Sequence, residues 1–293
     1  MNNSCTLCPR NCNVNRENKL GVCGVGNTLK LAKVSLHKWE EPCISGKNGS
    51  GTVFFSGCSL KCVFCQNYKI SHEGFGKEIS VNRLSDIFLE LEQMGAENIN
   101  LVSAGHFVPQ IITALDMVKQ KLSIPIVYNS SGYESISTLK LLEGYIDIFL
   151  PDVKYFSPEL SKKYSNAENY FQYASKAILE MHRQQPTLQF DGEMLKKGVI
   201  IRHLILPRCR KDSLKIIDWI HNSLPQNSYL ISLMSQYTPC FKAETFPEIN
   251  RRITTFEYNS VLNKIIEYNM DGFFQDRNSA TLEYTPDFDL SGV

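Results

Sequence analysis

Three cysteines in one short loop are the residues of this sequence best suited to chemistry. Cys58, Cys62 and Cys65 follow a β-branched and aromatic run at residues 52–55, which predicts a buried strand that Gly57 ends. Thiolate ligands select zinc, copper(I) or iron-sulfur clusters. A structural zinc takes four Cys or His ligands, and a 4Fe-4S cluster usually takes four cysteines. Because this loop supplies three, we expect a 4Fe-4S cluster with one iron open to a chelating small molecule.

The spacing Cys58-x3-Cys62-x2-Cys65, with Phe64 just before the last cysteine, resembles the signature of the radical S-adenosylmethionine superfamily. This resemblance implies that the open iron binds the amino and carboxylate groups of S-adenosylmethionine (SAM). An electron from the cluster then breaks the bond from sulfur to the 5′-carbon, and the resulting 5′-deoxyadenosyl radical abstracts hydrogen from a substrate. Phe64 would lie near the adenine. The competing interpretation, three core cysteines or a disulfide pair plus one, fits three cysteines beside a strand end poorly.

A second group of four cysteines precedes this loop. Cys5, Cys8, Cys12 and Cys23 offer a full ligand set for either a structural zinc or a second iron-sulfur cluster, and the spacing does not distinguish them. Neighbouring Pro and Gly residues favour a loop bent around a metal over a mobile tail with free thiols. The remaining three cysteines have no cysteine close in sequence and receive no role: Cys43, Cys209 and Cys240.

The composition excludes several classes of protein. The 293 residues are 43% apolar, as in a globular core, and 31 basic and 30 acidic residues leave a formal charge of +1. This balance predicts no nucleic acid partner. Residues 1–10 do not resemble a signal peptide and no apolar run approaches a membrane span, so we expect no membrane partner and a cytoplasmic location. Ten cysteines without a secretion signal indicate metal or redox use.

Strand and helix patterns alternate along the chain after the cysteine loop. Apolar runs predict strands at residues 98–103, 124–129, 146–150, 199–206 and 229–235, and a short one at 271–274. Helical spacing appears between Ser80 and Gly95, and at residues 108–122, 133–143, about 167–183, 214–224 and 258–268. This order predicts an α/β fold, an open, partial (β/α)6 barrel. The resemblance of the cysteine loop implies that this barrel is of the radical SAM type.

Three segments follow from this pattern. Residues 1–48 form a Cys-rich, metal-binding N-terminal extension, in which the alternating residues 29–39 predict a strand at the edge of the sheet. Residues 49–277 form the barrel, and residues 278–293 a tail.

The active site of such a barrel lies at the carboxyl ends of its strands. Ser103, Ala104 and Gly105 follow the second barrel strand and are small enough for a ligand to approach the backbone. Superfamily members carry a Gly-Gly-Glu-like turn there, which holds the methionine amino group of SAM. This sequence departs from that turn, because His106 stands where a Glu is expected. His106 is either a site residue or a hydrogen-bonded histidine at a strand end.

Polar and charged residues also follow or interrupt the next three strands. Asp152 and Lys154 point to the same side of a strand. Asp152 and Lys154 resemble the Asp-x-Lys segment that lies near the SAM carboxylate and ribose in glycyl-radical-enzyme activating enzymes. The alternative for these two residues is an ion pair at the surface. Asn129 matches a polar residue near the ribose in the same enzymes. Arg202 interrupts a buried run and needs an anion, which the methionine carboxylate, an acidic substrate group or a structural Asp would supply. The predicted cofactor-binding residues are Phe64, Ser103, Gly105, Asn129, Asp152, Lys154 and Arg202.

A narrower resemblance covers nearly the whole chain. The run Cys5-x2-Cys8-Pro9-Arg10-Asn11-Cys12, the cluster loop and residues 151–155 are similar to the family named for pyruvate formate-lyase activating enzymes, although Tyr68 replaces their usual Pro. This resemblance implies a radical SAM oxidoreductase that abstracts hydrogen from its substrate, such as a backbone glycine of a partner protein, with flavodoxin or ferredoxin as reductant. Two alternatives stay open: a radical SAM enzyme that modifies a small metabolite or peptide, and a non-enzymatic iron-sulfur or zinc protein.

Overall fold

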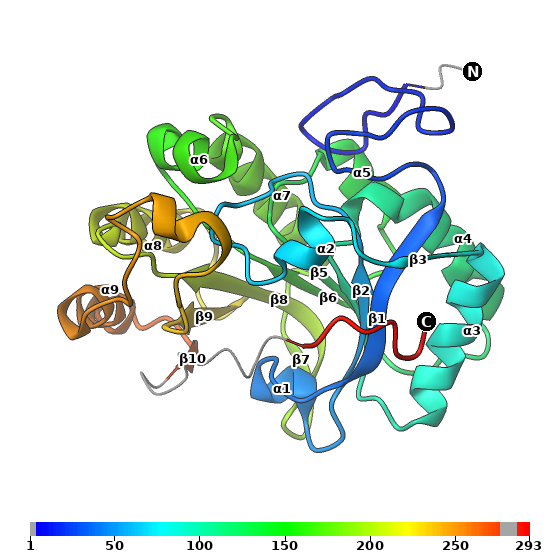
Figure 1. Ribbon diagram of the computed structural model, residues 1–293. Helices are drawn as coiled ribbons and strands as arrows, with labels where there is room; N and C mark the ends of the chain where they lie inside the picture. The colour runs from blue at the N-terminus through cyan, green and yellow to red at the C-terminus, as the bar shows by residue number, and fades with distance from the viewer. Residues whose placement is uncertain (1–3, 276–285) are drawn as a thin grey trace.

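One mixed sheet organises the computed structural model, which describes residues 4–275 and 286–293 (Figure 1). The strand order is β10-β9-β8-β6-β5-β4-β2-β1-β3. Seven of the described strands run parallel to one another and lie side by side in the sheet, in the order in which they occur along the chain. They are β2 (Ser50–Phe55), β4 (Ile99–Val102), β5 (Ile126–Ser130), β6 (Ile148–Pro151), β8 (Met194–Leu204), β9 (Leu230–Met234) and β10 (Gly272–Phe274). Strands β10 and β3 stand at the two ends of the sheet, so the barrel is open, as predicted.

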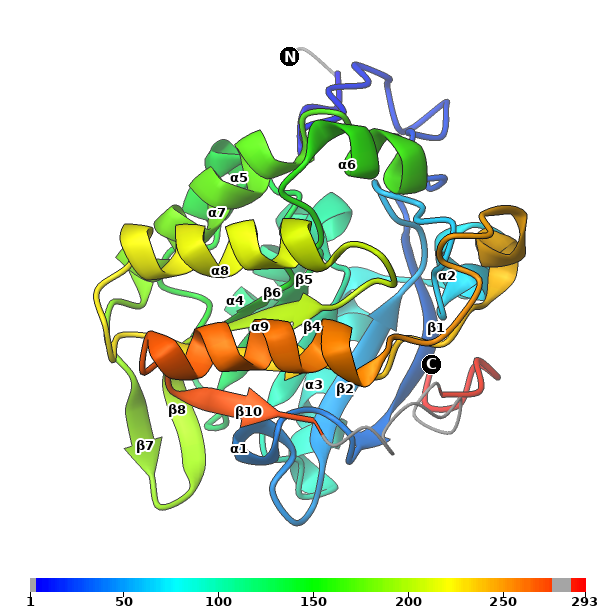
Figure 2. The ribbon, with the colours of Figure 1, turned by 90° about the vertical axis from the view of Figure 1, so that its left-hand side faces the viewer.

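Helices cover the outer face of this sheet (Figure 2). They are α3 (Val81–Gln93), α4 (Val108–Val118), α5 (Ile136–Leu141), α6 (Pro158–Ser165), α7 (Tyr170–Gln184), α8 (Arg210–Ser223) and α9 (Thr255–Glu267). Ser80 caps α3 as predicted, because its hydroxyl accepts the Arg83 N–H at 3.1 Å. Helix α6 was not predicted, since its polar sequence buries few apolar residues. None of the described helices is both long and apolar enough to traverse a lipid bilayer.

The N-terminal part of the sheet differs from the prediction. Strand β1 (Leu29–His37) is not at the edge: it pairs antiparallel with β2 on one side and with β3 (Lys77–Ile79) on the other. Two short strands were not predicted: β3, and β7 (Gln189–Asp191), which forms a hairpin with β8. Each has only three residues, too few to show an alternation of apolar and polar residues in the sequence. Strand β1 thus shares the sheet of the barrel, while the boundary predicted at residues 277 and 278 lies outside the described residues.

A short helix, α1 (Pro42–Ser45), closes the barrel interior on the side where the parallel strands begin. Cys43 and Ile44 of α1 are buried in an apolar cluster with residues of β5, β6, β8 and β9. Cys43 therefore belongs to the apolar floor of the barrel. The opposite end, where the parallel strands finish, carries the polar groups described below.

Residues 286–293, which we call the closing strap, cross the outer edge of β1 (Figure 1). The Leu290 N–H donates to the Ala32 carbonyl at 3.1 Å, and the Val34 N–H donates to the Ser291 carbonyl at 2.8 Å. Phe288 is buried in an apolar cluster with Ala32, Phe54, Ile70 and Val102. The strap therefore covers backbone groups of β1 that β3 leaves unpaired.

Candidate active site

The three-cysteine loop follows β2 and leads into the short helix α2 (Tyr68–Ser71). Each of its sulfurs accepts a hydrogen bond: Cys58 from the Leu60 N–H at 3.4 Å, Cys62 from the Ser165 hydroxyl at 3.0 Å, and Cys65 from the Ser71 hydroxyl at 3.2 Å. Such donors stabilise a thiolate.

The electrostatics of the loop fit a positively charged metal centre. Burial raises the pKa of Cys62, and burial together with the charges of Cys62 and Cys58 raises the pKa of Cys65 to about 12. Thiolates in this place need nearby positive charge, which the irons of a cluster provide. Among the described residues, no three His, Cys, Asp or Glu side chains lie close enough together for a single metal ion. A four-iron cubane is larger than one ion and holds its thiolates further apart.

The ring of Phe64 lies in an aromatic cluster. It is buried, with ring centroids 6.4 Å from Tyr155, 6.4 Å from Tyr164 and 5.8 Å from Tyr237. The Cys240 thiol donates to the Phe64 carbonyl at 3.2 Å, so this cysteine helps to fix the loop. The adenine contact of Phe64 stays a prediction.

The turn after β4 is shaped by close contacts. Ser103 has φ of 58°, in the left-handed region, and its N–H donates to the Asn129 carbonyl at 2.9 Å. A β-carbon on Gly105 would lie 2.6 Å from Glu134 Oε2, so any larger residue there would have to displace the Glu134 carboxylate. His106 is buried, and burial lowers its pKa to about 4, so its neutral ring donates to the Ser56 carbonyl at 2.8 Å. Of the two interpretations of His106, the structure supports the hydrogen-bonded histidine at a strand end.

The predicted polar residues on β5, on β8 and directly after β6 come together inside the barrel. Arg202 donates to Asp152 Oδ1 at 2.9 Å and to Asn129 Oδ1 at 2.6 Å, and Lys154 Nζ lies 2.6 Å from Asp152 Oδ2. The side chains of Asp152 and Lys154 are only 15% and 18% exposed, so the surface ion pair considered for them is wrong. The four residues form one charged network.

Glu40 is a member of this network that sequence analysis missed. Its carboxylate accepts hydrogen bonds from Arg202 Nη1 at 3.0 Å and from Asn100 Nδ2 at 3.0 Å. Arg202 therefore has two protein anions, Glu40 and Asp152, which favours the structural partner among the three anions considered for it. The nearby Glu41 is buried, and burial raises its pKa. Glu40 lies in a loop without helical or strand periodicity, so no pattern indicated that it reaches β8.

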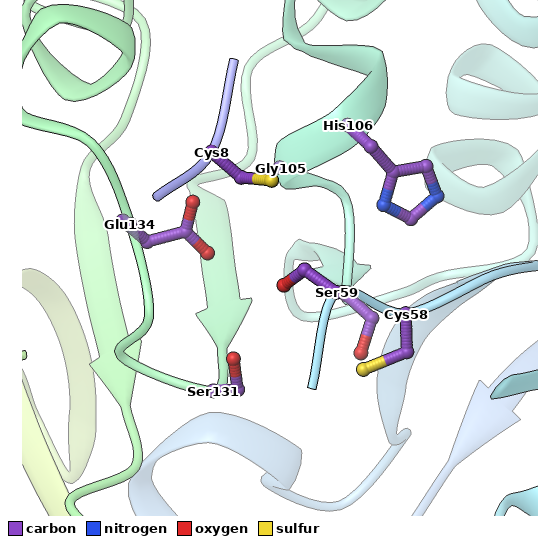
Figure 3. Close-up of a pocket in the computed structure, with 8 residues that line it drawn as sticks. Cys8, Cys58, Ser59, Gly105, His106, Ser131 and Glu134 are labelled. Atoms are coloured by element: carbon purple, nitrogen blue, oxygen red, sulfur yellow. The ribbon is translucent and has the colours of Figure 1, made fainter. Parts of the chain in front are cut away.

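A small cavity joins the cluster loop to the strand-end turns (Figure 3). The carboxylate of Glu134, the Ser131 hydroxyl and the thiols of Cys8 and Cys58 surround it in this view. Glu134 is buried, and burial raises its pKa to about 8, although the nearby hydroxyls of Tyr128 and Ser130 act to lower it. Sequence analysis missed Glu134, because residues 133–143 were predicted to be helical, whereas α5 begins only at Ile136. The remaining residues that line the cavity are Ser59, Ser103, Gly105 and His106.

The four N-terminal cysteines lie against the cluster loop. The Cys58 N–H donates to the Cys23 carbonyl at 3.0 Å, and Cys8 lines the same cavity as Cys58. The sulfurs of Cys12 and Cys23 both lie close to Gly21: a β-carbon on that residue would be 3.6 Å from the Cys12 sulfur and 3.1 Å from the Cys23 sulfur. Electrostatic and hydrogen-bonding contacts connect the four sulfurs with one another, and burial raises the pKa of Cys8 to about 12. The structure thus places these cysteines near one another, but no three of these described thiols lie close enough for a single metal ion, and their metal stays a prediction.

These features define the class of protein: an open α/β barrel with a three-cysteine loop at the carboxyl end of its first parallel strand. A family model described as Radical SAM superfamily matches residues 52–238. The chain belongs to the radical SAM superfamily, whose members use a 4Fe-4S cluster and SAM, and these are its cofactors.

Individual relatives are similar to this chain over different extents. The uncharacterized protein MJ0674 of Methanocaldococcus jannaschii is 32% identical over 278 residues, which are 92% of this chain and 76% of that protein. SuiB of Streptococcus suis, crystallised with the precursor peptide SuiA, has a similar fold with a TM-score of 0.50 and 12% identity, over 75% of this chain. This chain corresponds to 46% of SuiB, less than half of its length.

Proposed function

We propose that this radical SAM enzyme acts as a glycyl-radical-enzyme activase, which abstracts hydrogen from a backbone glycine of a partner protein. When bound, the cluster supplies the electron that cleaves SAM to the 5′-deoxyadenosyl radical. The observation that carries the proposal is the charged network, because Asn129, Asp152 and Lys154 match the activase pattern and gather inside the barrel. An open barrel also gives a peptide loop room to enter, which a closed one would not.

Within this proposal, each predicted residue has a role. Cys58, Cys62 and Cys65 hold the cluster, the backbone at Ser103 and Gly105 approaches the methionine part of SAM, and Phe64 lies near the adenine. Asn129, Asp152 and Lys154 contact the ribose and the carboxylate. Arg202 is a positioning residue, because Asp152, Asn129 and Glu40 already occupy its guanidinium. A flavodoxin or ferredoxin as reductant and a cytoplasmic location belong to the same proposal.

Glu134 supplies the acidic group that position 106 lacks. Its carboxylate is buried, is directed into the cavity beside Cys58, and has no ion pair with a described Lys, Arg or His side chain (Figure 3). It would accept a hydrogen bond from the amino group of SAM. A hydrogen bond to a charged group contributes roughly 1.5–3 kcal/mol, so Glu134→Gln should weaken SAM binding roughly 10- to 150-fold.

This role of Glu134 is tested by equilibrium binding of SAM to the reconstituted protein under anaerobic conditions. Glu143→Gln is the matched control, because the Glu143 side chain is 52% exposed and pairs with Arg183 at the surface. Equal affinities for SAM in Glu134→Gln and Glu143→Gln would remove Glu134 from the site.

A second candidate is a radical SAM enzyme that modifies a peptide or a small metabolite. The similarity in fold to SuiB, which was crystallised with a precursor peptide, favours a peptide among these substrates. The two candidates differ in the size of the substrate, not in the cleavage of SAM.

One experiment separates these functions. The reduced protein is incubated with SAM and with cell extract divided by size into macromolecules and metabolites, and 5′-deoxyadenosine is measured. The activase role predicts stimulation by the macromolecular fraction and a glycyl radical signal in its electron paramagnetic resonance (EPR) spectrum. Stimulation only by the small-molecule fraction would contradict the activase role. A protein that forms no 5′-deoxyadenosine under any of these conditions would support the non-enzymatic alternative.

A further inference from the structure

The N-terminal segment that carries Cys5, Cys8, Cys12 and Cys23 has almost no regular structure. Residues 5–28 contain no helix and no extended strand; the only regular pairing is the bridge between Ser4 and Asn15. The sulfurs of Cys12 and Cys23 nevertheless lie beside the same point at Gly21, Cys23 is buried, and the charge of Cys5 acts on Cys8 and Cys23. A loop of this kind lacks an apolar core of its own, and a metal bound by four cysteines is a common way to hold such a segment.

The segment is attached to the cluster loop rather than to a remote surface. The Cys23 carbonyl accepts the Cys58 N–H at 3.0 Å, which joins a residue of one cysteine group to a residue of the other through a single hydrogen bond. Gly57 makes this approach feasible, because a β-carbon there would lie 2.9 Å from the Cys23 carbonyl oxygen. The sulfurs of both residues are a few covalent bonds away from this hydrogen bond.

Arg10 makes a second connection between the two groups. It lies between Cys8 and Cys12, and it donates to the Ser59 carbonyl at 2.8 Å and to the Ser165 carbonyl at 2.9 Å. The Ser165 hydroxyl in turn donates to the sulfur of Cys62. The N-terminal group is therefore attached to the cluster loop at Cys58 and Ser59, and to the residue that donates to Cys62.

The segment also lies over the Cys58 end of the cluster loop. It forms the outermost layer of the molecule beyond the carboxyl ends of the parallel strands (Figures 1 and 2). Leu20 and Val22, which precede Cys23, are 66% and 47% exposed. An electron carrier that docks on this side would meet the N-terminal cysteines before it reaches Cys58.

We propose that Cys5, Cys8, Cys12 and Cys23 bind a redox-active iron-sulfur cluster that passes electrons to the cluster at Cys58, Cys62 and Cys65 through the contact between Cys23 and Cys58. A zinc ion has no redox chemistry and would only fold the segment. In this relay a one-electron carrier, a flavodoxin or ferredoxin, is oxidised by one electron for each electron that reaches the Cys58 loop. No bond is made or broken and no proton is transferred.

The first test asks which metal the N-terminal group holds. Iron and zinc are measured in the Cys58→Ala/Cys62→Ala/Cys65→Ala variant after anaerobic reconstitution, and its EPR spectrum is recorded after reduction. We expect this variant to retain iron and an iron-sulfur signal. Replacing Cys5, Cys8, Cys12 and Cys23 by Ala should remove roughly a third to a half of the iron in the full protein, for a two-iron or a four-iron cluster.

Other metal contents would overturn the proposal. Zinc at the N-terminal group, or iron content unchanged by the four N-terminal substitutions, excludes a second cluster. Cys43→Ala is the matched control, since Cys43 lies in the apolar floor of the barrel and its loss should leave the iron unchanged.

The second test measures electron transfer itself. Stopped-flow spectroscopy follows the reduction of the Cys58 cluster by flavodoxin hydroquinone and, separately, by dithionite, a small molecule. The variant without the four N-terminal cysteines should react at least tenfold more slowly with flavodoxin and within about twofold of the unmodified protein with dithionite. Equal rates with flavodoxin would refute the relay, and so would equal slowing with both reductants. None of these measurements uses a substrate, so they stand even if the activase role fails.

Discussion

Replacing Arg202 by Met should lower the free energy of unfolding by about 3–5 kcal/mol, the usual effect of removing one partner from a buried ion pair. The side chains of Arg202, Glu40 and Asp152 are only 13%, 11% and 15% exposed, so solvent screens their charges weakly. Asp152 would keep Lys154 at 2.6 Å. Glu40 would keep hydrogen bonds from Asn100 and Asn129 but would lose its cation, and this buried, uncompensated charge accounts for most of the loss.

Urea denaturation followed by far-ultraviolet circular dichroism measures this loss from the midpoint and the slope. The double variant Arg202→Met/Glu40→Gln should recover about 0.5–3 kcal/mol, because it removes the charge left alone. Arg183→Met is the control, since Arg183 is 51% exposed and solvent screens its surface pairs, so its loss should destabilise the protein far less than the loss of Arg202. If Arg202→Met costs less than about 1 kcal/mol, or if the double variant is no more stable than the single one, the network does not hold the barrel interior as argued.

Three further predictions concern the cluster loop and a buried histidine. Cys62→Ala should remove the iron at this loop and stop the cleavage of SAM; retained iron together with unchanged 5′-deoxyadenosine formation would contradict the assignment. Ser165→Ala deletes the 3.0 Å hydrogen bond from the Ser165 hydroxyl to the sulfur of Cys62. Because such bonds stabilise the reduced form of a cluster, the reduction potential of the cluster should fall by an amount on the order of tens of millivolts. An EPR-monitored redox titration that shows no shift would argue against this bond. Burial lowers the pKa of His203 to about 4, whereas a histidine in an unfolded chain has a pKa near 6.5. Between pH 6.5 and pH 4 the unfolded chain therefore binds a proton at this residue that the folded protein does not bind. As the pH falls through this range, His203 lowers the free energy of unfolding by about 1.4 kcal/mol per pH unit. His203→Asn keeps an N–H for the Val153 carbonyl and should flatten this dependence in urea midpoints measured at pH 5 and 7.5; the same slope in both proteins would mean that His203 does not titrate there.

Local patterns in the sequence predict the parts of this molecule that depend on local physics. The spacing of Cys58, Cys62 and Cys65 after an apolar run indicates both the cluster loop and its position at a strand end. The rule that parallel strands finish at the same edge then places Asn129, Asp152 and Lys154 near one another, and the structure gathers them. Arg202 was expected to need an anion, because a charge in a buried run cannot stay unpaired.

Contacts between distant segments could not be predicted in this way. Glu40 reaches Arg202 across 162 residues, and no local periodicity marks a side chain that enters the barrel from a loop. Glu134 follows a strand but belongs to a stretch whose apolar spacing is also compatible with a helix, so its place in the cavity depends on where α5 begins. The pairing of β3 with β1 likewise depends on packing, since three residues show no period.

The position of the closing strap at residues 286–293 has a consequence for folding during synthesis on the ribosome. Its Asp289 pairs with Lys33 on β1, 256 residues earlier in the chain. A ribosome that adds about 5–20 residues per second needs roughly 10–50 s to synthesise the segment between them. During that time the outer edge of β1 and the apolar surface around Phe54 and Val102 stay uncovered in the nascent chain. An exposed strand edge beside apolar surface is a site for chaperone binding or aggregation, so the yield of folded protein should depend on how quickly translation reaches these last contacts.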